Sequence, residues 1–164
     1  MQAKERQVNL FAVVAVALVV VLGGSVLAQS SNPHVGMWKA NIAKSKVVSG
    51  TPIKSTTTKI EAAGAGVKYT VDGAYADGSV RHWEFTANYD GKDNRVTGDS
   101  PYGDVVALTR VNATTVRIVN KKNGKVTATQ TSVVSSNSKM RTVTTNGTDA
   151  LGQSVNTVIV YDKQ

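Results

Sequence analysis

The chain contains no cysteine, and this absence excludes several classes of protein at once. Disulfide-stapled scaffolds, thiol-dependent enzymes and thiolate metal centres all need cysteine side chains. A lipid anchor attached to an N-terminal cysteine is excluded for the same reason. A chain of 164 residues can nevertheless form a domain that its hydrophobic core alone stabilises.

Histidine is nearly as scarce, because the chain has two, His34 and His82. No His-x-His or His-Glu-x-x-His spacing is present, so no zinc site is predicted. His82 and Glu84 lie two positions apart on an expected strand and could form an acid–base pair, which would make the protein an enzyme. A surface pair of modest strength is the simpler interpretation. We therefore expect no catalytic residue, no metal and no cofactor.

Dense runs of basic residues interleaved with aromatic ones are also lacking, which argues against binding to nucleic acid. The 19 Lys and Arg residues exceed the 11 Asp and Glu residues, giving a net charge of +8. Removal of residues 1–28 would lower this charge to +7, because Lys4, Arg6 and Glu5 leave together. A positive charge favours anionic surfaces or ligands, although scattered lysines also keep a protein soluble without any partner.

The long apolar run of the chain lies within residues 1–28. Positive residues precede it, and it ends at Val26-Leu27-Ala28, which is typical of a secretory signal peptide cleaved after Ala28. We expect a signal helix there and a monomeric domain over residues 29–164, exported to the periplasm or the exterior of a bacterial cell. The alternative is an uncleaved membrane anchor, since residues 10–28 nearly reach the length of a spanning helix.

Helical periodicity is almost absent after the apolar run, where leucine is reduced to Leu108 and Leu151. Valine and threonine dominate, and turn residues recur about every ten positions, a pattern typical of all-β sandwiches and barrels. Residues 80–89 give the clearest strand, because apolar and polar side chains alternate along them. Asn123-Gly124 is a strong signal for a tight hairpin turn.

Ten strands joined by short loops are predicted in all, with room for one helical turn at residues 41–46. They cover residues 36–41, 55–62, 67–72, 80–89, 95–98, 105–111, 115–121, 125–134, 140–145 and 155–162. An open sheet of this width would curl and expose its edges. The expected fold is therefore an antiparallel up-and-down meander barrel of about 8–10 strands.

The segment Val35-Gly36-Met37-Trp38-Lys39, followed by this meander, resembles the opening of the calycin superfamily, the lipocalins and fatty-acid-binding proteins. It is most similar to the small exported bacterial lipocalin-like proteins. The resemblance makes Gly36 and Trp38 a structural signature of the fold. It implies that the Trp38 indole packs across one end of the barrel, beneath an arginine from a late strand, Arg141 or Arg117.

The chain also departs from the fatty-acid-binding proteins in two places. Residues 42–54 are too few, and too interrupted by Gly50 and Pro52, to form the two helices that cover the portal in that family. The family's Arg-x-Tyr pair for the ligand carboxylate is incomplete on the last strand, where Tyr161 remains but Ile159 replaces the arginine. Carboxylate binding of that particular type is therefore not implied.

Candidate ligand-binding residues project from strands that the meander would bring together. They are Tyr69, Val71, Trp83, Phe85, Tyr89, Arg141 and Tyr161. The apolar members could line a small lumen, and an inward-facing Arg141 would be a buried cation that needs an anionic partner. We expect non-catalytic binding of a small apolar or amphipathic molecule, with or without a negative charge, in the cell envelope or outside the cell. The alternative is a structural or protein-interaction module with a filled barrel core.

Overall fold

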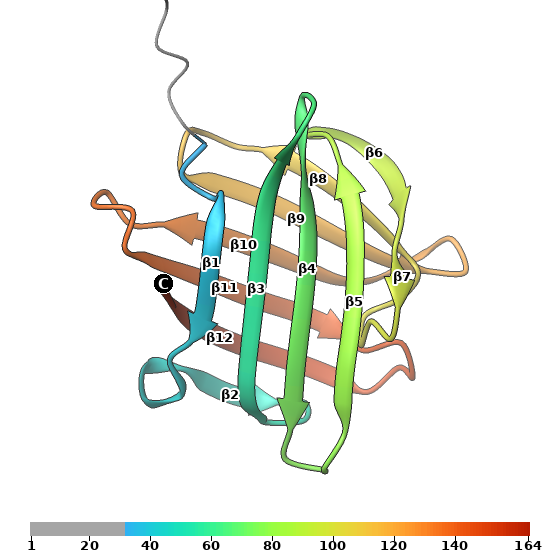
Figure 1. The fold of residues 1–164 in the computed structure, drawn as a ribbon. Helices are drawn as coiled ribbons and strands as arrows, with labels where there is room; N and C mark the ends of the chain where they lie inside the picture. Colours follow the sequence, from blue (N-terminus) through green and yellow to red (C-terminus); the bar gives the residue numbers. More distant parts are fainter. Residues whose placement is uncertain (1–31) are drawn as a thin grey trace, which may run out of the picture. The chain divides into compact units, whose positions relative to one another are not determined.

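The structure is a computed structural model that describes residues 32–164, so the expected signal peptide lies outside the described residues. The described part is all-β, as predicted (Figure 1). Its elements are β1 (Gly36–Ala40), the 3-10 turn η1 (Ile42–Lys44), β2 (Lys46–Ser49), β3 (Ile53–Ala63), β4 (Gly66–Tyr75), β5 (Val80–Ala87), β6 (Asp90–Arg95), β7 (Thr97–Gly98), β8 (Val105–Arg110), β9 (Thr115–Lys122), β10 (Lys125–Val134), β11 (Met140–Thr148) and β12 (Ser154–Lys163). Within residues 32–164, no helix has the length and apolar character needed to cross a membrane.

All twelve strands belong to one sheet, and every pairing is antiparallel. The order is β6-β8-β9-β10-β11-β12-β1-β3-β4-β5-β7, with β2 paired to β12 beside this path. Most neighbours are consecutive in the chain, and β12 returns to pair with β1. The sheet therefore curls into a nearly closed barrel, which confirms the predicted fold (Figure 1).

Residues 90–98 bridge the seam where the barrel would otherwise stay open, between β5 and β8. Their first part, β6, pairs with β8, and their last two residues, β7, pair with β5. We predicted one strand at residues 95–98 and a loop at residues 46–49, so the structure has two strands more than expected. The two additional strands have different causes: β2 is four residues long and pairs with the distant β12, and β6 contains no apolar side chain that would mark it as a strand.

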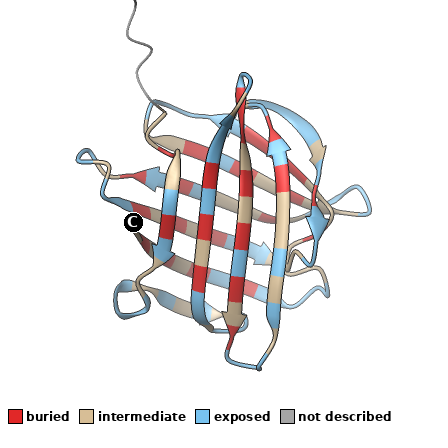
Figure 2. Cartoon of the chain, viewed as in Figure 1, coloured by how far each residue is buried: buried red, intermediate tan, exposed pale blue. Residues whose placement is uncertain are grey.

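The closed end of the barrel is filled around Trp38, whose side chain is 0% exposed. Buried positions alternate with exposed ones along β3 and β4, as expected for strands with one face in a core (Figure 2). The indole Nε1 of Trp38 donates a hydrogen bond to the His34 carbonyl at 2.8 Å. The guanidinium carbon of Arg141 lies 5.8 Å from the Trp38 ring centroid, whereas Arg117 is exposed. The arginine of the structural signature is therefore Arg141.

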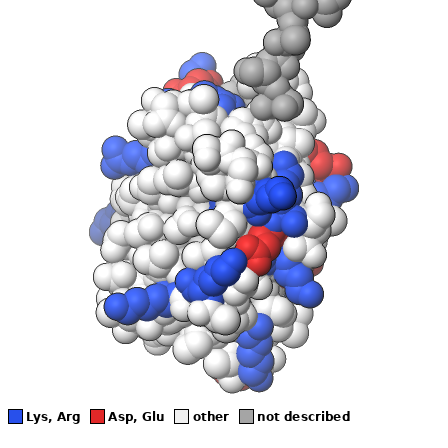
Figure 3. All heavy atoms as spheres, turned by 90° about the vertical axis from the view of Figure 1, so that its left-hand side faces the viewer, with Lys and Arg blue, Asp and Glu red and all other residues white. Residues whose placement is uncertain are grey.

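The outer surface holds most of the charged side chains. On the face drawn in Figure 3, Lys and Arg side chains are spread among uncharged ones, with fewer acidic residues between them. The closest outer ion pairs, such as Lys59–Glu61 at 2.8 Å and Lys121–Asp93 at 2.7 Å, are accessible to solvent and therefore contribute little to stability. Inside the barrel, by contrast, Arg141 is buried.

Candidate functional site

A cavity of about 130 Å³ lies inside the barrel, next to the core around Trp38. Its lining runs from inward-facing strand residues to the β2–β3, β7–β8 and β11–β12 loops, where it reaches the surface at Thr51, Pro101 and Asp149. A cavity of this size would hold about four water molecules. The barrel interior is therefore not filled by its own side chains.

One wall of the cavity is largely apolar and comes from β4 and β5. Tyr69 pairs with Phe85 and Val71 with Trp83 across these strands, so all four side chains face the same way. The Tyr69 and Phe85 rings stack with their centroids 4.7 Å apart. This wall offers a flat aromatic surface on which the apolar part of a ligand could pack.

Arg141 of β11 stands at the inner end of the cavity and is 4% exposed. Its guanidinium carbon lies 4.7 Å from the Tyr161 ring centroid and 5.9 Å from that of Tyr69. No ion pair within residues 32–164 includes this arginine. Its Nε and Nη1 atoms are buried without hydrogen-bond partners. A buried cation with neither a counter-charge nor full hydrogen bonding is unfavourable unless an anion joins it.

The two phenols beside Arg141 remain neutral donors. Burial raises the pKa of Tyr69 to about 12, although the positive charge of Arg141 partly offsets the effect. Burial likewise raises the pKa of Tyr161 above its ordinary value, against the opposing charge of Arg141. The Tyr69 hydroxyl is buried without a hydrogen-bond partner. Arg141 and Tyr69 thus present unused N–H and O–H groups at the same end of the cavity.

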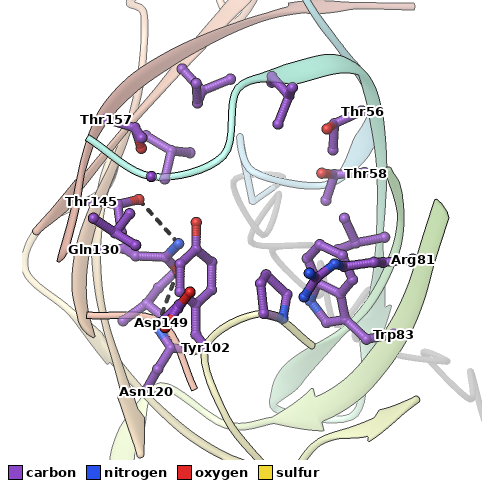
Figure 4. Close-up of a pocket in the computed structure, with 18 of the residues that line it drawn as sticks. Thr56, Thr58, Arg81, Trp83, Tyr102, Asn120, Gln130, Thr145, Asp149 and Thr157 are labelled. Atoms are coloured by element: carbon purple, nitrogen blue, oxygen red, sulfur yellow. Dashed lines mark hydrogen bonds between the residues drawn. The ribbon is translucent and has the colours of Figure 1, made fainter. Parts of the chain in front are cut away.

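Polar side chains form the opposite wall, on β9 to β12 (Figure 4). Gln130, Thr145 and Thr157 are direct partners across β10, β11 and β12, and Asn120 of β9 continues the series. We call these four residues the polar row. Gln130 Nε2 donates to Thr145 Oγ1 at 3.2 Å, and Asn120 Nδ2 donates to Gln130 Oε1 at 3.4 Å. The cavity therefore has an apolar wall and a hydrogen-bonding wall facing each other.

Six of the seven predicted lumen residues line this cavity. They are Tyr69, Val71, Trp83, Phe85, Arg141 and Tyr161. Tyr89 is absent from the lining: its hydroxyl accepts a hydrogen bond from Asn32 at 2.8 Å, and the Arg110 guanidinium lies 4.0 Å from its ring centroid. Tyr89 still faces the interior, because it is half-buried between two exposed residues and packs against the core, but it lies outside the cavity.

His82 and Glu84 are not paired with each other, so the acid–base pair that we considered does not form. His82 Nδ1 lies 2.7 Å from Asp72 Oδ1, and Glu84 forms an ion pair with Lys68 at 2.8 Å. The hydrogen bond from Lys68 lowers the pKa of Glu84 below its ordinary value. Both partners come from β4 on the outer face, because cross-strand neighbours lie closer than residues i and i+2. Among residues 32–164, no three His, Asp or Glu side chains gather as metal ligands.

Sequence analysis missed the polar row and several further lining residues, among them Arg81, Tyr102 and Asp149. Threonine suits either face of a sheet, and Thr145 and Thr157 are buried on the inner face. A usable signal was the alternation of β9, in which Asn120 follows Val116 and Ile118 on the inward side. Arg81 comes from the start of β5, and Tyr102 and Asp149 come from loops, where no periodicity assigns a direction.

Comparison with known proteins adds one observation on the fold. No family profile and no curated protein matches the chain. Among solved structures, the chain is similar to zebrafish ileal bile acid-binding protein in complex with cholic acid, with 13% identical residues and a TM-score of 0.46. The similarity covers 80% of this chain and 99% of that chain. The nearly closed antiparallel barrel described above is the fold class that the sequence predicted.

Proposed function

We propose that the protein binds a small amphipathic anion without changing it chemically. The observation that carries this proposal is Arg141, a buried guanidinium that faces a cavity and has no counter-charge among the described residues. The anionic group of the ligand would accept hydrogen bonds from Arg141 and from the Tyr69 hydroxyl. The apolar part would lie against the aromatic wall that includes Phe85 and Trp83.

The energetics of burial support an anion at this position. A buried charge becomes tolerable when an opposite charge and hydrogen bonds satisfy it together. A hydrogen bond that involves a charged group is about twice as strong as a neutral one, and Arg141 has two donor nitrogens to offer, Nε and Nη1. A carboxylate, sulfonate or phosphate would each meet this requirement, and a neutral apolar molecule would not.

The rival interpretation, a structural module with a filled core, fits these residues less well. It leaves about 130 Å³ without an occupant and gives Arg141 no partner. Catalysis has no place in the proposal, since the carboxylate that reaches the cavity, Asp149, already accepts N–H groups from Leu151 and Gln153 at 2.9 Å each. We further propose that binding occurs outside the cytoplasm, on the strength of the signal-like pattern in residues 1–28.

The proposal is tested with two fluorescent probes that differ by one charge. Anilinonaphthalene sulfonate is amphipathic and anionic, and phenylnaphthylamine is its neutral counterpart. We expect the anionic probe to bind the native protein more tightly. Replacing Arg141 by Gln should weaken binding of the anionic probe by at least about tenfold and leave binding of the neutral probe nearly unchanged.

The matched control is Arg117→Gln, which removes the same charge from the outer face and should alter neither titration. Continued binding of the neutral probe shows that the Arg141→Gln variant is folded. Equal losses for both probes, or none for either, would contradict the role of Arg141. If neither probe binds the native protein, the filled structural module becomes the better interpretation.

A further inference from the structure

The polar row has a regular geometry that the proposed anion site does not use. Gln130, Thr145 and Thr157 face one another across three consecutive strands, and all three line the cavity. Direct neighbours on one face of an antiparallel sheet lie about 5 Å apart, so the row forms a continuous band of hydrogen-bonding groups. Apolar side chains could fill these inward positions, as Val143 and Ile159 do on β11 and β12.

The row also retains unused hydrogen-bonding capacity. The Thr157 side chain is 7% exposed, and its Oγ1 is buried without a partner. Thr145 Oγ1 accepts a hydrogen bond from Gln130 and lies beside the Tyr102 hydroxyl, so it already has partners. The two contacts of Asn120 Nδ2, at 3.4 and 3.5 Å, are long for hydrogen bonds. Buried groups left in this state require a partner inside the cavity, either water or a ligand atom.

We propose that the polar row recognises a hydroxyl group on the ligand, so that the preferred ligands are hydroxylated amphipathic anions rather than plain alkyl ones. The inference rests on the proposed function in one respect, since the ligand is taken to occupy the same cavity. It goes further by adding a second polar contact, and that contact would decide which amphipathic anions are bound.

The spacing along β11 indicates where the ligand hydroxyl should lie. Arg141 and Thr145 both face inward and are four residues apart, which corresponds to about 13 Å along an extended strand. The anionic group and the hydroxyl should therefore stand at opposite ends of an extended apolar segment. An ω-hydroxydecanoate molecule has this arrangement. Decanoate is the matched control, because it differs from ω-hydroxydecanoate only in having no terminal hydroxyl group.

The test is a competition experiment on the protein purified from cells that express the full-length chain. Anilinonaphthalene sulfonate is bound first and then displaced by either acid. We expect ω-hydroxydecanoate to displace the probe at about tenfold lower concentration than decanoate, because decanoate leaves the row unpaired. Thr157→Val, which keeps the side-chain shape, should reduce this preference to about twofold or less.

A second variant distinguishes an effect of the polar row from the effect of any Thr→Val exchange in the cavity lining. Thr56→Val makes the same exchange at a buried, cavity-lining threonine of β3 outside the row, and it should keep the preference of the native protein. Decanoate binding by each variant reports that the protein is folded. Displacement by neither acid would contradict the proposed function. Equal displacement by both would show that the row holds water, and would overturn this inference while leaving the proposed function standing.

Discussion

His34 is a buried titratable side chain near Arg141 that does not line the cavity. It is 0% exposed, and neither ring nitrogen has a hydrogen-bond partner. Burial, together with the positive charges of Arg141 and Arg110, lowers its pKa from 6.5 to about 4. The neutral imidazole is thus the form that fits the folded barrel, while the unfolded chain accepts a proton at its ordinary pKa.

This difference predicts a loss of stability in mild acid. Between pH 6.5 and about pH 4 the unfolded chain binds a proton that the folded state rejects, so the free energy of unfolding decreases as the pH falls. Above pH 6.5 His34 is neutral in both states, and the free energy of unfolding has its full value. At pH 4 this free energy should be lower by about 3 kcal/mol. Urea unfolding at several pH values measures this slope, and His34→Gln should flatten it.

The second histidine provides the control for this experiment. His82→Gln removes an exposed imidazole from the outer face, and the free energy of unfolding of that variant should still decrease as the pH falls. A His34→Gln protein that retains the full slope would show that other groups, such as the carboxylates of the surface ion pairs, cause the acid sensitivity.

The alternation of apolar and polar residues along single strands correctly predicted which face of the sheet several side chains of the site occupy. Tyr69, Val71, Trp83 and Phe85 face the interior because their strands keep a strict period of two. The same argument could not find Thr157, since threonine fits either face of a sheet and its burial depends on the partner strand. Residue type alone therefore indicated the apolar wall and missed the polar one.

At the level of elements, the pairing of β10 with β11 depends on one close backbone approach. The register of β10 against β9 shifts between Val126 and Ala128, and Ala128 lies opposite Gly147 of β11. A Cβ atom at Gly147 would lie 2.2 Å from the Thr127 carbonyl oxygen, and the residue has φ = +136°. Glycine is therefore required at this position for both steric and conformational reasons.

Replacing Gly147 by Ala should destabilise the protein by more than about 2 kcal/mol, because backbone atoms rather than a flexible side chain must move. Thermal unfolding measures the effect. Gly64→Ala is the matched control: Gly64 also has positive φ, at +57°, but a Cβ there meets nothing within 4 Å. Its cost should stay near about 1 kcal/mol, and equal costs for the two variants would contradict the steric argument.

The ten predicted strands all have counterparts in the structure, and the 3-10 turn lies within the region expected for it. The strands that were missed, β2 and β6, differ in composition from the rest. Residues 90–95 contain no apolar side chain, and β2 is four residues long. Their strand conformation comes from pairing with β8 and β12, which local sequence patterns do not encode.

For the barrel as a whole, the seam between β5 and β8 is the weakest part of the wall. β5 and β7 pair at two positions, whereas β3 and β4 pair at ten. We expect the amides of residues 90–98 to exchange with deuterium well before those of β3 and β4, because few hydrogen bonds must break to open the seam. Exchange followed by mass spectrometry measures this order, and equal protection of both regions would show that the barrel opens as one unit.

The pairing of the last strand with the first has a consequence for how the protein reaches its folded state. β12 contacts β1, β2 and β11, so three strands lack a neighbour until the C-terminal residues are available. Contacts between distant parts of a chain form late, since the entropy of loop closure must be overcome first. The barrel thus cannot close while the polypeptide is still emerging from the ribosome or threading through a translocation channel.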